Sequence, residues 1–145
     1  MIWPSPHTPH LNPTQIQALE GRLRPWRNPI GGIWGPPGTG KTFVAACEAA
    51  QAILEYDEKV LVCTFENATV DQTLRNIIAL LKSTYGCGKE TIERLVKRIG
   101  YRSRIDSDVQ AICNHDELDM AKIVGTTLHS SSSSSSSSCL AYQIP

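Results

Sequence analysis

The segment Gly35-Pro36-Pro37-Gly38-Thr39-Gly40-Lys41-Thr42 constrains this chain more than any other part of its sequence. It matches the pattern G-x-x-x-x-G-K-[ST] at every position. Glycines let the backbone curl so that successive N–H groups point at phosphate oxygens, and the helix that follows directs its positive end at the same anion. The pattern therefore predicts a loop that binds the phosphates of a nucleotide.

Two residues of this loop have side chains suited to the chemistry of a nucleoside triphosphate. The Lys41 ammonium is expected to reach the β- and γ-phosphates, and the Thr42 hydroxyl is expected to bind Mg²⁺. The sequence thus predicts ATP and Mg²⁺ as cofactors, with Lys41 and Thr42 as the catalytic candidates. The remaining predicted cofactor-binding residues of the loop are Gly35, Pro36, Pro37, Gly38, Thr39 and Gly40.

Hydrophobic patterns on both sides of the loop predict an α/β fold. Asn12 and Pro13 fit the N-cap and the first position of a helix. The other expected elements are a short strand over 30–34, a long helix from Lys41 to about Tyr56, a buried strand over 60–65, a helix over 69–82 and a third strand over 122–127. Residues 90–99 fit either a helix or a short strand. This order predicts a parallel sheet with crossover helices.

Composition predicts three regions. Residues 1–10 contain three prolines and two histidines and are expected to be a flexible lead-in. Residues 11–129 are expected to form one nucleotide-binding domain, with a polar insertion over about 84–120. Nine consecutive serines, Ser130–Ser138, bury no apolar area on ordering, so residues 130–145 are predicted to be a low-complexity tail.

Charge alone does not identify a binding partner. Lys and Arg number 14, and Asp and Glu also number 14. A basic stretch between Lys82 and Arg104 could be a footprint for phosphates or a solvated face, and charge leaves both open. Apolar runs are too short for a membrane span. The five cysteines are widely spaced and form no CxxC pair, so we expect them to be reduced thiols. The sequence predicts an intracellular protein, cytoplasmic or nuclear, with no membrane partner.

A segment ahead of the loop introduces a family resemblance. Leu11-Asn12-Pro13-Thr14-Gln15-Ile16-Gln17-Ala18-Leu19 resembles the Q motif, L-N-x-x-Q-x-x-A-[VL], of superfamily 1 helicases. In that family the glutamine amide recognises adenine through a paired donor and acceptor. The resemblance therefore implies that Gln15 belongs to the nucleotide site.

A second segment resembles motif Ia of the same helicases. Residues 60–72, VLVCTFENATVDQ, are similar to V-L-V-C-A-P-S-N-x-A-V-D, and the resemblance implies that Asn67 contacts the backbone of a nucleic acid strand. Phe65 and Glu66 stand where the family has proline and serine. A carboxylate at Glu66 would repel a phosphate. We interpret Phe65 as a packed residue at the strand end, with stacking on a base as the alternative.

Two further segments complete the resemblance. Lys122-Ile123-Val124-Gly125-Thr126-Thr127-Leu128-His129 is similar to the next family strand, which implies that Thr126 and Thr127 contact nucleic acid. Residues 98–104, RIGYRSR, resemble the R-[ILV]-G-x-x-[SR] stretch of related helicases. The nearest group is superfamily 1B, typified by the nonsense-mediated-decay helicase and senataxin. The resemblance implies a RecA-like ATP-binding domain acting on single-stranded RNA or DNA. The alternative is an AAA+ or other P-loop ATPase acting on protein.

The acidic Walker B strand of these helicases has no match after residue 127. Ser130–Ser138 occupies the expected place, and Asp116-Glu117 is rejected because it precedes the third strand. The Walker B residues hold Mg²⁺ and orient the attacking water. We therefore expect the N-terminal part of a first RecA-like domain, truncated before Walker B. Its sheet should be incomplete, and without a second motor domain the chain should be inactive alone.

Overall fold

The computed structural model describes residues 11–23, 32–100, 104–113, 118–128 and 140–143. Its α-helices are α1 (Pro13–Leu23), α2 (Lys41–Glu55), α3 (Asn67–Ser83) and α4 (Lys89–Leu95). Its strands are β1 (Val60–Thr64), β2 (Val96–Arg98), β3 (Ile123–Thr127) and β4 (Leu140–Gln143), and two 3₁₀ turns are η2 (Gln110–Ile112) and η3 (Leu118–Met120). Helices connect the strands of a parallel sheet, which confirms the predicted α/β class.

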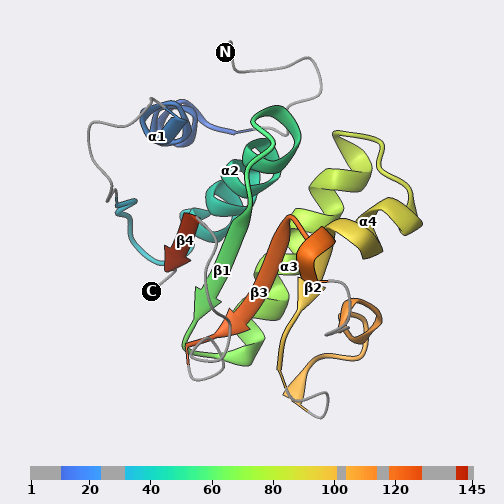
Figure 1. Cartoon of the computed structure of the whole chain (residues 1–145). Helices are drawn as coiled ribbons and strands as arrows, with labels where there is room; N and C mark the ends of the chain where they lie inside the picture. The colour runs from blue at the N-terminus through green and yellow to red at the C-terminus, as the bar shows by residue number, and fades with distance from the viewer. Residues whose placement is uncertain (1–10, 24–31, 101–103, 114–117, 129–139, 144–145) are drawn as a thin grey trace.

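The four strands form one parallel sheet in the order β2-β3-β1-β4 (Figure 1). The register of the central pair aligns Val60 with Ile123 and Thr64 with Thr127. Because the strands are parallel, the residues that follow β1, β2 and β3 all leave the sheet at one edge, its carboxyl edge. In open α/β sheets ligands bind outside this edge.

The core lies between the sheet and two helices. Helices α2 and α3 pack against each other, and both contact β1. The innermost side chains of α3 are fully buried: Val70, Leu74, Ile77 and Leu81. Each buried Leu or Ile contributes about 1.5–3 kcal/mol relative to exposure. The facing side of α2 is rich in buried alanines, which allow the two helices to approach closely.

Residues 90–99, which fit either a helix or a short strand in the sequence, contain a helix followed by a strand. Helix α4 ends at Leu95, and β2 begins at Val96 and pairs with β3. Val96 is fully buried, and the Lys122 N–H bonds to the Leu95 carbonyl oxygen at 2.9 Å. The segment that we interpreted as an insertion thus supplies one edge strand of the sheet.

The strand expected over 30–34 is absent from its described part. Residues 32–34 are irregular, and the Trp34 side chain is 98% exposed. Beside β1, on the side away from β3, lies β4, whose Leu140 aligns with Val60. Glycine loses more conformational freedom on forming a strand than other residues do. The exposed Trp34 side chain offers no buried area to offset that cost. That prediction is therefore wrong for residues 32–34, and residues 30–31 lie outside the described part.

Strand β4 lies in the C-terminal region of the chain. Residues 140–143, which belong to the predicted low-complexity tail, pair with β1 in parallel. The serine run and the lead-in, residues 1–10, lie outside the described residues. Within the described residues, no helix combines the length and hydrophobicity that a membrane crossing requires.

Candidate functional site

The loop between Trp34 and α2 adopts a tight curl. Gly38 has φ +78° and Gly40 has φ +79°, both in the left-handed region that favours glycine. Gly40 is the N-cap of α2, and the Val44 N–H bonds to its carbonyl oxygen at 3.0 Å. The loop therefore delivers the chain directly into the positive end of a 15-residue helix.

The Lys41 ammonium lies within this curl. Its Nζ donates to the carbonyl oxygen of Gly35 at 2.7 Å and to that of Pro36 at 2.9 Å. The Thr39 hydroxyl donates to the same Pro36 carbonyl at 2.7 Å. An ammonium has three donors, so Lys41 has one left for an anion in the loop and could exchange the two carbonyl oxygens for further anion oxygens.

The Gln15 amide bonds to the start of α1 through its oxygen and to the loop through its nitrogen. Its Oε1 accepts the Asn12 N–H at 3.0 Å, while Asn12 Oδ1 accepts the Gln15 N–H at 2.9 Å. This reciprocal pair is a capping box and confirms Asn12 as the N-cap. The Gln15 Nε2 donates to the Thr39 carbonyl oxygen at 3.0 Å. The structure thus brings Gln15 to the loop, where it bonds to a residue 24 positions away in the sequence.

The residues present fit ATP and Mg²⁺. The loop contains a lysine and no carboxylate between Gly35 and Thr42, and it lies at the N-terminus of α2, a combination that favours an anion. Among the described residues, no group of three or more His, Cys, Asp and Glu side chains is placed to hold a metal. Mg²⁺ in nucleotide sites is commonly held by one or two protein groups together with the phosphates. The Thr42 hydroxyl, in the first turn of α2, is the candidate protein ligand.

A second group of predicted residues lies at the carboxyl edge of the sheet. Thr126 and Thr127 are buried at the end of β3, and the Thr126 hydroxyl donates to the Thr127 carbonyl oxygen at 3.3 Å. Asn67, partly exposed, is the first residue of α3 and follows β1 by three positions. The burial of both threonines leaves Asn67 as the more accessible of the predicted nucleic-acid contacts.

Phe65 is exposed beside Asn67. Its side chain is 64% exposed, so the interpretation as a packed residue at the strand end is wrong. Leu128, which follows β3, is also exposed, and its N–H bonds to the Thr64 carbonyl oxygen at 3.0 Å. β1 turns into α3 directly after Thr64, and this turn directs Phe65 away from the core. An exposed aromatic ring at this edge is suited to stacking on a base.

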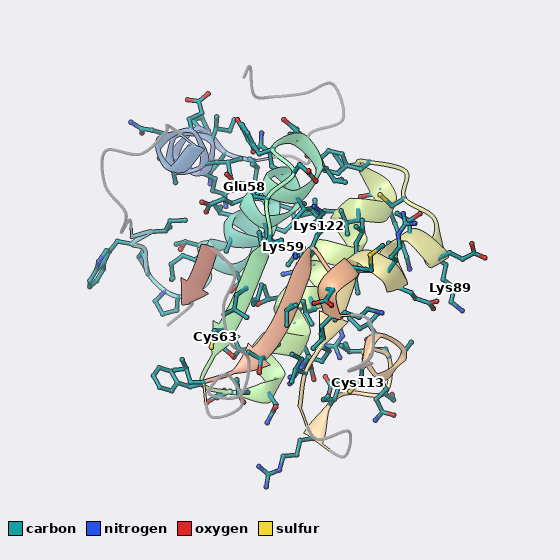
Figure 2. All side chains as sticks on the ribbon, in the orientation of Figure 1. Glu58, Lys59, Cys63, Lys89, Cys113 and Lys122 are labelled. Atoms are coloured by element: carbon teal, nitrogen blue, oxygen red, sulfur yellow. The ribbon has the colours of Figure 1, made fainter. Side chains whose placement is uncertain are left out.

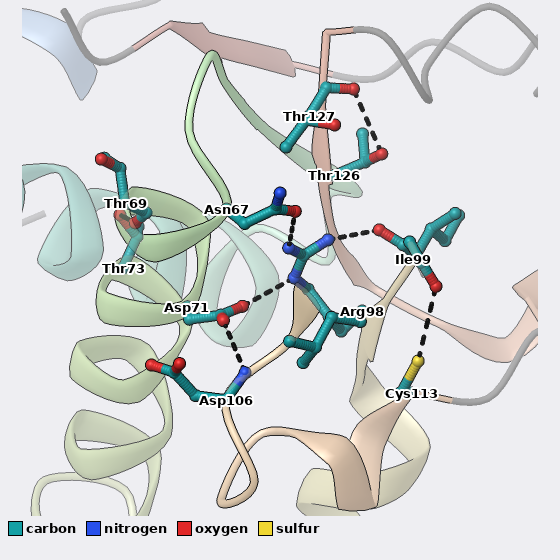
Figure 3. A network of polar contacts seen from close by, with 12 residues as sticks. Asn67, Thr69, Asp71, Thr73, Arg98, Ile99, Asp106, Cys113, Thr126 and Thr127 are labelled. Atoms are coloured by element: carbon teal, nitrogen blue, oxygen red, sulfur yellow. Dashed lines mark hydrogen bonds and ion pairs between the residues drawn. The ribbon is translucent and has the colours of Figure 1, made fainter. Parts of the chain in front are cut away.

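Arg98 is the residue whose position differs most from expectation. The sequence places it in a basic stretch, yet its side chain is 0% exposed. Its Nε donates to Asp71 Oδ1 at 2.7 Å, its Nη2 donates to Asn67 Oδ1 at 2.8 Å, and its Nη1 bonds to the Ile99 carbonyl (Figure 3). Asp71 Oδ2 accepts the Asp106 N–H at 3.0 Å. Arg98 therefore contributes nothing to an exposed basic face.

One signal in the sequence could have identified this network. Asp71 lies one residue after Val70 and three before Leu74, so it falls on the apolar face of the predicted helix. A carboxylate on a buried face requires a cationic or hydrogen-bonding partner. The pattern could not choose that partner, because several arginines follow between residues 94 and 104.

Two further groups, an ion-pair cluster around Arg75 and the Cys47 thiol, lie outside the loop and the Arg98 network (Figure 2 draws the described side chains). Arg75 on α3 bonds to Asp108 at 2.6 Å and to Asp106, and hydrogen bonding from Arg75 lowers the pKa of Asp108. Burial raises the pKa of the Cys47 thiol to about 12, which makes it a poor nucleophile.

A family model described as an AAA domain, AAA_11, matches residues 10–119. This range contains the phosphate loop, Gln15, the motif Ia segment and the Arg98 network. The chain belongs to this family. Its membership, together with the parallel sheet and the glycine loop, confirms the P-loop NTPase fold that the sequence predicts.

Three curated relatives indicate the group within the family. The chain is 33% identical over 118 residues to the Regulator of nonsense transcripts 1 homolog of Drosophila melanogaster, which is 81% of this chain and 9% of that protein. It is 39% identical over 85 residues to the Arabidopsis thaliana homolog of the same name, 58% of this chain and 6% of that protein. It is 31% identical over 98 residues to the DNA polymerase alpha-associated DNA helicase A of Saccharomyces cerevisiae, 67% of this chain and 12% of that protein.

These relatives confirm the resemblance to superfamily 1 helicases of the nonsense-mediated-decay type. The chain spans only about a tenth of the length of these proteins. No solved structure gave a significant match to the chain. The family assignment is therefore that of an ATP-dependent helicase-type segment.

Proposed function

We propose that this chain is the ATP-binding portion of a helicase that moves along single-stranded RNA or DNA. The observation that carries the proposal is the Lys41 ammonium held inside a loop whose Gly38 and Gly40 are left-handed, at the start of α2. Lys41 would exchange the carbonyl oxygens of Gly35 and Pro36 for phosphate oxygens. Thr42 would bind Mg²⁺, which supplies charge neutralisation to phosphoryl transfer when bound.

The adenine and the nucleic acid belong to two separate parts of the proposal. Gln15 lies against the loop and offers an amide to the base once its bond to Thr39 is exchanged. Asn67 and Phe65 provide a polar and an aromatic group at the carboxyl edge of the sheet. Support for a nucleic acid strand comes from this edge and from the motif Ia resemblance, and it does not distinguish RNA from DNA.

The 145 residues by themselves are expected to hydrolyse ATP very slowly. No apolar strand ending in Asp-Glu follows Thr127 in this sequence, so the carboxylates that hold Mg²⁺ and orient water are not supplied. Intracellular location, in the cytoplasm or the nucleus, remains a prediction.

The test is nucleotide binding by the purified 145-residue chain, with a fluorescent ATP analogue and Mg²⁺. Lys41→Ala should abolish measurable binding, while the same change at Lys89, exposed on α4 (Figure 2), should leave affinity within twofold or so of the original. Unchanged affinity in K41A would remove the nucleotide site. A turnover near one per second or so by the isolated chain would contradict the inactivity.

A further inference from the structure

The Arg98 guanidinium has three nitrogens, and each has a partner inside the protein. Nε pairs with Asp71 Oδ1 at 2.7 Å, Nη2 bonds to Asn67 Oδ1 at 2.8 Å, and Nη1 bonds to the Ile99 carbonyl. A fully buried cation with all nitrogens engaged cannot itself meet a ligand. Any influence of Arg98 on binding must therefore pass through a neighbour that reaches the surface.

Asn67 is that neighbour. A guanidinium only donates hydrogen bonds, so the amide atom that faces Arg98 must be the oxygen. The two N–H groups on Asn67 Nδ2 consequently point away from Arg98 (Figure 3). Among the described residues, no acceptor contacts Nδ2. Arg98 thereby fixes the orientation of the Asn67 amide. Without this bond the amide could turn either its NH2 group or its oxygen away from Arg98.

Two more contacts hold Arg98 itself in place. Asp71 lies one turn after Asn67 on α3, and its second oxygen accepts the Asp106 N–H at 3.0 Å. The Ile99 N–H, next along the chain, bonds to the Gly125 carbonyl oxygen of β3 at 2.9 Å. The Asn67 amide is thus attached, through Arg98, to both the edge strand β2 and the neighbouring strand β3.

We propose that Arg98 is a positioning residue that presents the Asn67 amide as a hydrogen-bond donor to a phosphate oxygen of single-stranded nucleic acid. The proposal rests on the proposed function and names the atom of that site that contacts the backbone. Asparagine side chains commonly bond to nucleic acid phosphates.

Two substitutions separate the role of the donor from the stability of the network. Asn67→Asp keeps an oxygen for Arg98 and removes the donor that faces outward. Arg98→Lys keeps a buried cation for Asp71, but a single ammonium does not reproduce the fork that also reaches Asn67. Ala68→Asp, on the exposed neighbour of Asn67, is the matched control, because it adds the same charge without touching the amide.

The experiment uses the full chain and fluorescent oligonucleotides of about ten nucleotides, oligo(U) and oligo(dT), at fixed salt concentration. N67D and R98K should each lower oligonucleotide affinity by about tenfold or more, with the fluorescent ATP analogue bound as in the unmodified chain. A68D should lower oligonucleotide affinity clearly less than N67D. In ¹⁵N spectra the Asn67 side-chain amide signal, identified by its loss in N67D, should shift when oligonucleotide is added.

The outcomes separate two failures. If the unmodified chain binds the ATP analogue but neither oligonucleotide, the nucleic-acid part of the proposed function is overturned, and this inference falls with it. If the unmodified chain binds oligonucleotide, the inference alone is overturned by unchanged affinity in N67D or in a folded R98K, by an equal loss in A68D, or by an unmoved Asn67 amide signal. The last measurement needs no variant bound to ligand, so it can overturn the contact at Asn67 even if R98K fails to fold.

Discussion

Asp71 and Arg98, 27 residues apart in the sequence, form an ion pair of 2.7 Å whose side chains are 1% and 0% exposed. Removing one member of a buried pair leaves an uncompensated charge, which costs about 3–5 kcal/mol. Replacing both members with apolar side chains of similar volume is often much less harmful. The pair joins α3 to β2, so it couples motif Ia to the edge of the sheet.

Asp71→Ala should therefore lower the free energy of unfolding by about 3–5 kcal/mol, measured by urea denaturation. The double variant D71L/R98M should be more stable than D71A alone, because no charge remains buried. A double variant that loses as much stability as the D71L and R98M single changes added together would show no coupling between the two residues and would contradict the buried ion pair.

Gly40 and Gly38 offer a matched test of the loop. Both have positive φ, so alanine at either position costs about 1–2 kcal/mol of backbone strain. A Cβ at Gly40 would also lie 2.7 Å from Gln15 Nε2, whereas one at Gly38 would meet nothing within 4 Å. G40A should lower stability more than G38A. In a Gln15→Ala background the two changes should cost the same, and a persistent difference would show that Gln15 is not the obstacle.

Gly125 lies directly beneath α3. A Cβ there would meet Leu74 Cδ1 at 2.7 Å and Val70 Cγ1 at 3.0 Å. Overpacking of this kind costs about 1–3 kcal/mol. Gly125→Ala should lower the thermal midpoint, and Gly32→Ala, which meets nothing within 4 Å, should not. Adding Leu74→Val to G125A should recover part of the loss, and no recovery would place the strain elsewhere.

Phe65 provides a test of base stacking. A stacked base contributes about 1–3 kcal/mol, so Phe65→Ala should weaken oligonucleotide binding by about fivefold or more. Its exposure predicts a change in stability within about 0.5 kcal/mol. Phe65→Leu keeps apolar area without an aromatic face and should bind nearly as weakly as F65A. Full affinity in F65L would indicate that apolar contact alone is sufficient.

The bond between Asp57 and Lys122 leads us to expect a small pH dependence of the thermal midpoint. Its carboxylate accepts a hydrogen bond from Lys122 at 2.7 Å, and this bond lowers the Asp57 pKa below its ordinary 3.8. Stabilisation from a lowered carboxyl pKa is present above the unfolded value and is lost as pH falls through the folded value. Asp57 has φ +53°, which asparagine tolerates, so Asp57→Asn is the suitable comparison.

The thermal midpoint of the unmodified chain should exceed that of D57N at about pH 6 and approach it as the pH falls below about 3.8. The pair is exposed, so the difference should also shrink with added salt. A difference that grows as the pH falls would contradict the assignment.

The sequence by itself determined the phosphate loop, the α/β class and the helicase resemblance, because each depends on local spacing. The loop needs glycines at fixed positions before a lysine, and β1 and β3 need short apolar runs. Asn12 and Gln15 likewise stand three residues apart, so their capping box could be expected from the chain order of the Q motif.

The tertiary structure alone decided which polar side chains are buried and which aromatic side chains are exposed. Arg98 appeared in a basic stretch and Phe65 in an apolar strand, yet Arg98 is buried and Phe65 lies in solvent. The outcome depends on the crossing of α3 over β2 and β3, which places Asp71 above Arg98, and on the turn after Thr64. Composition cannot encode such contacts, because they join residues about 30 positions apart and exist only once the sheet has formed.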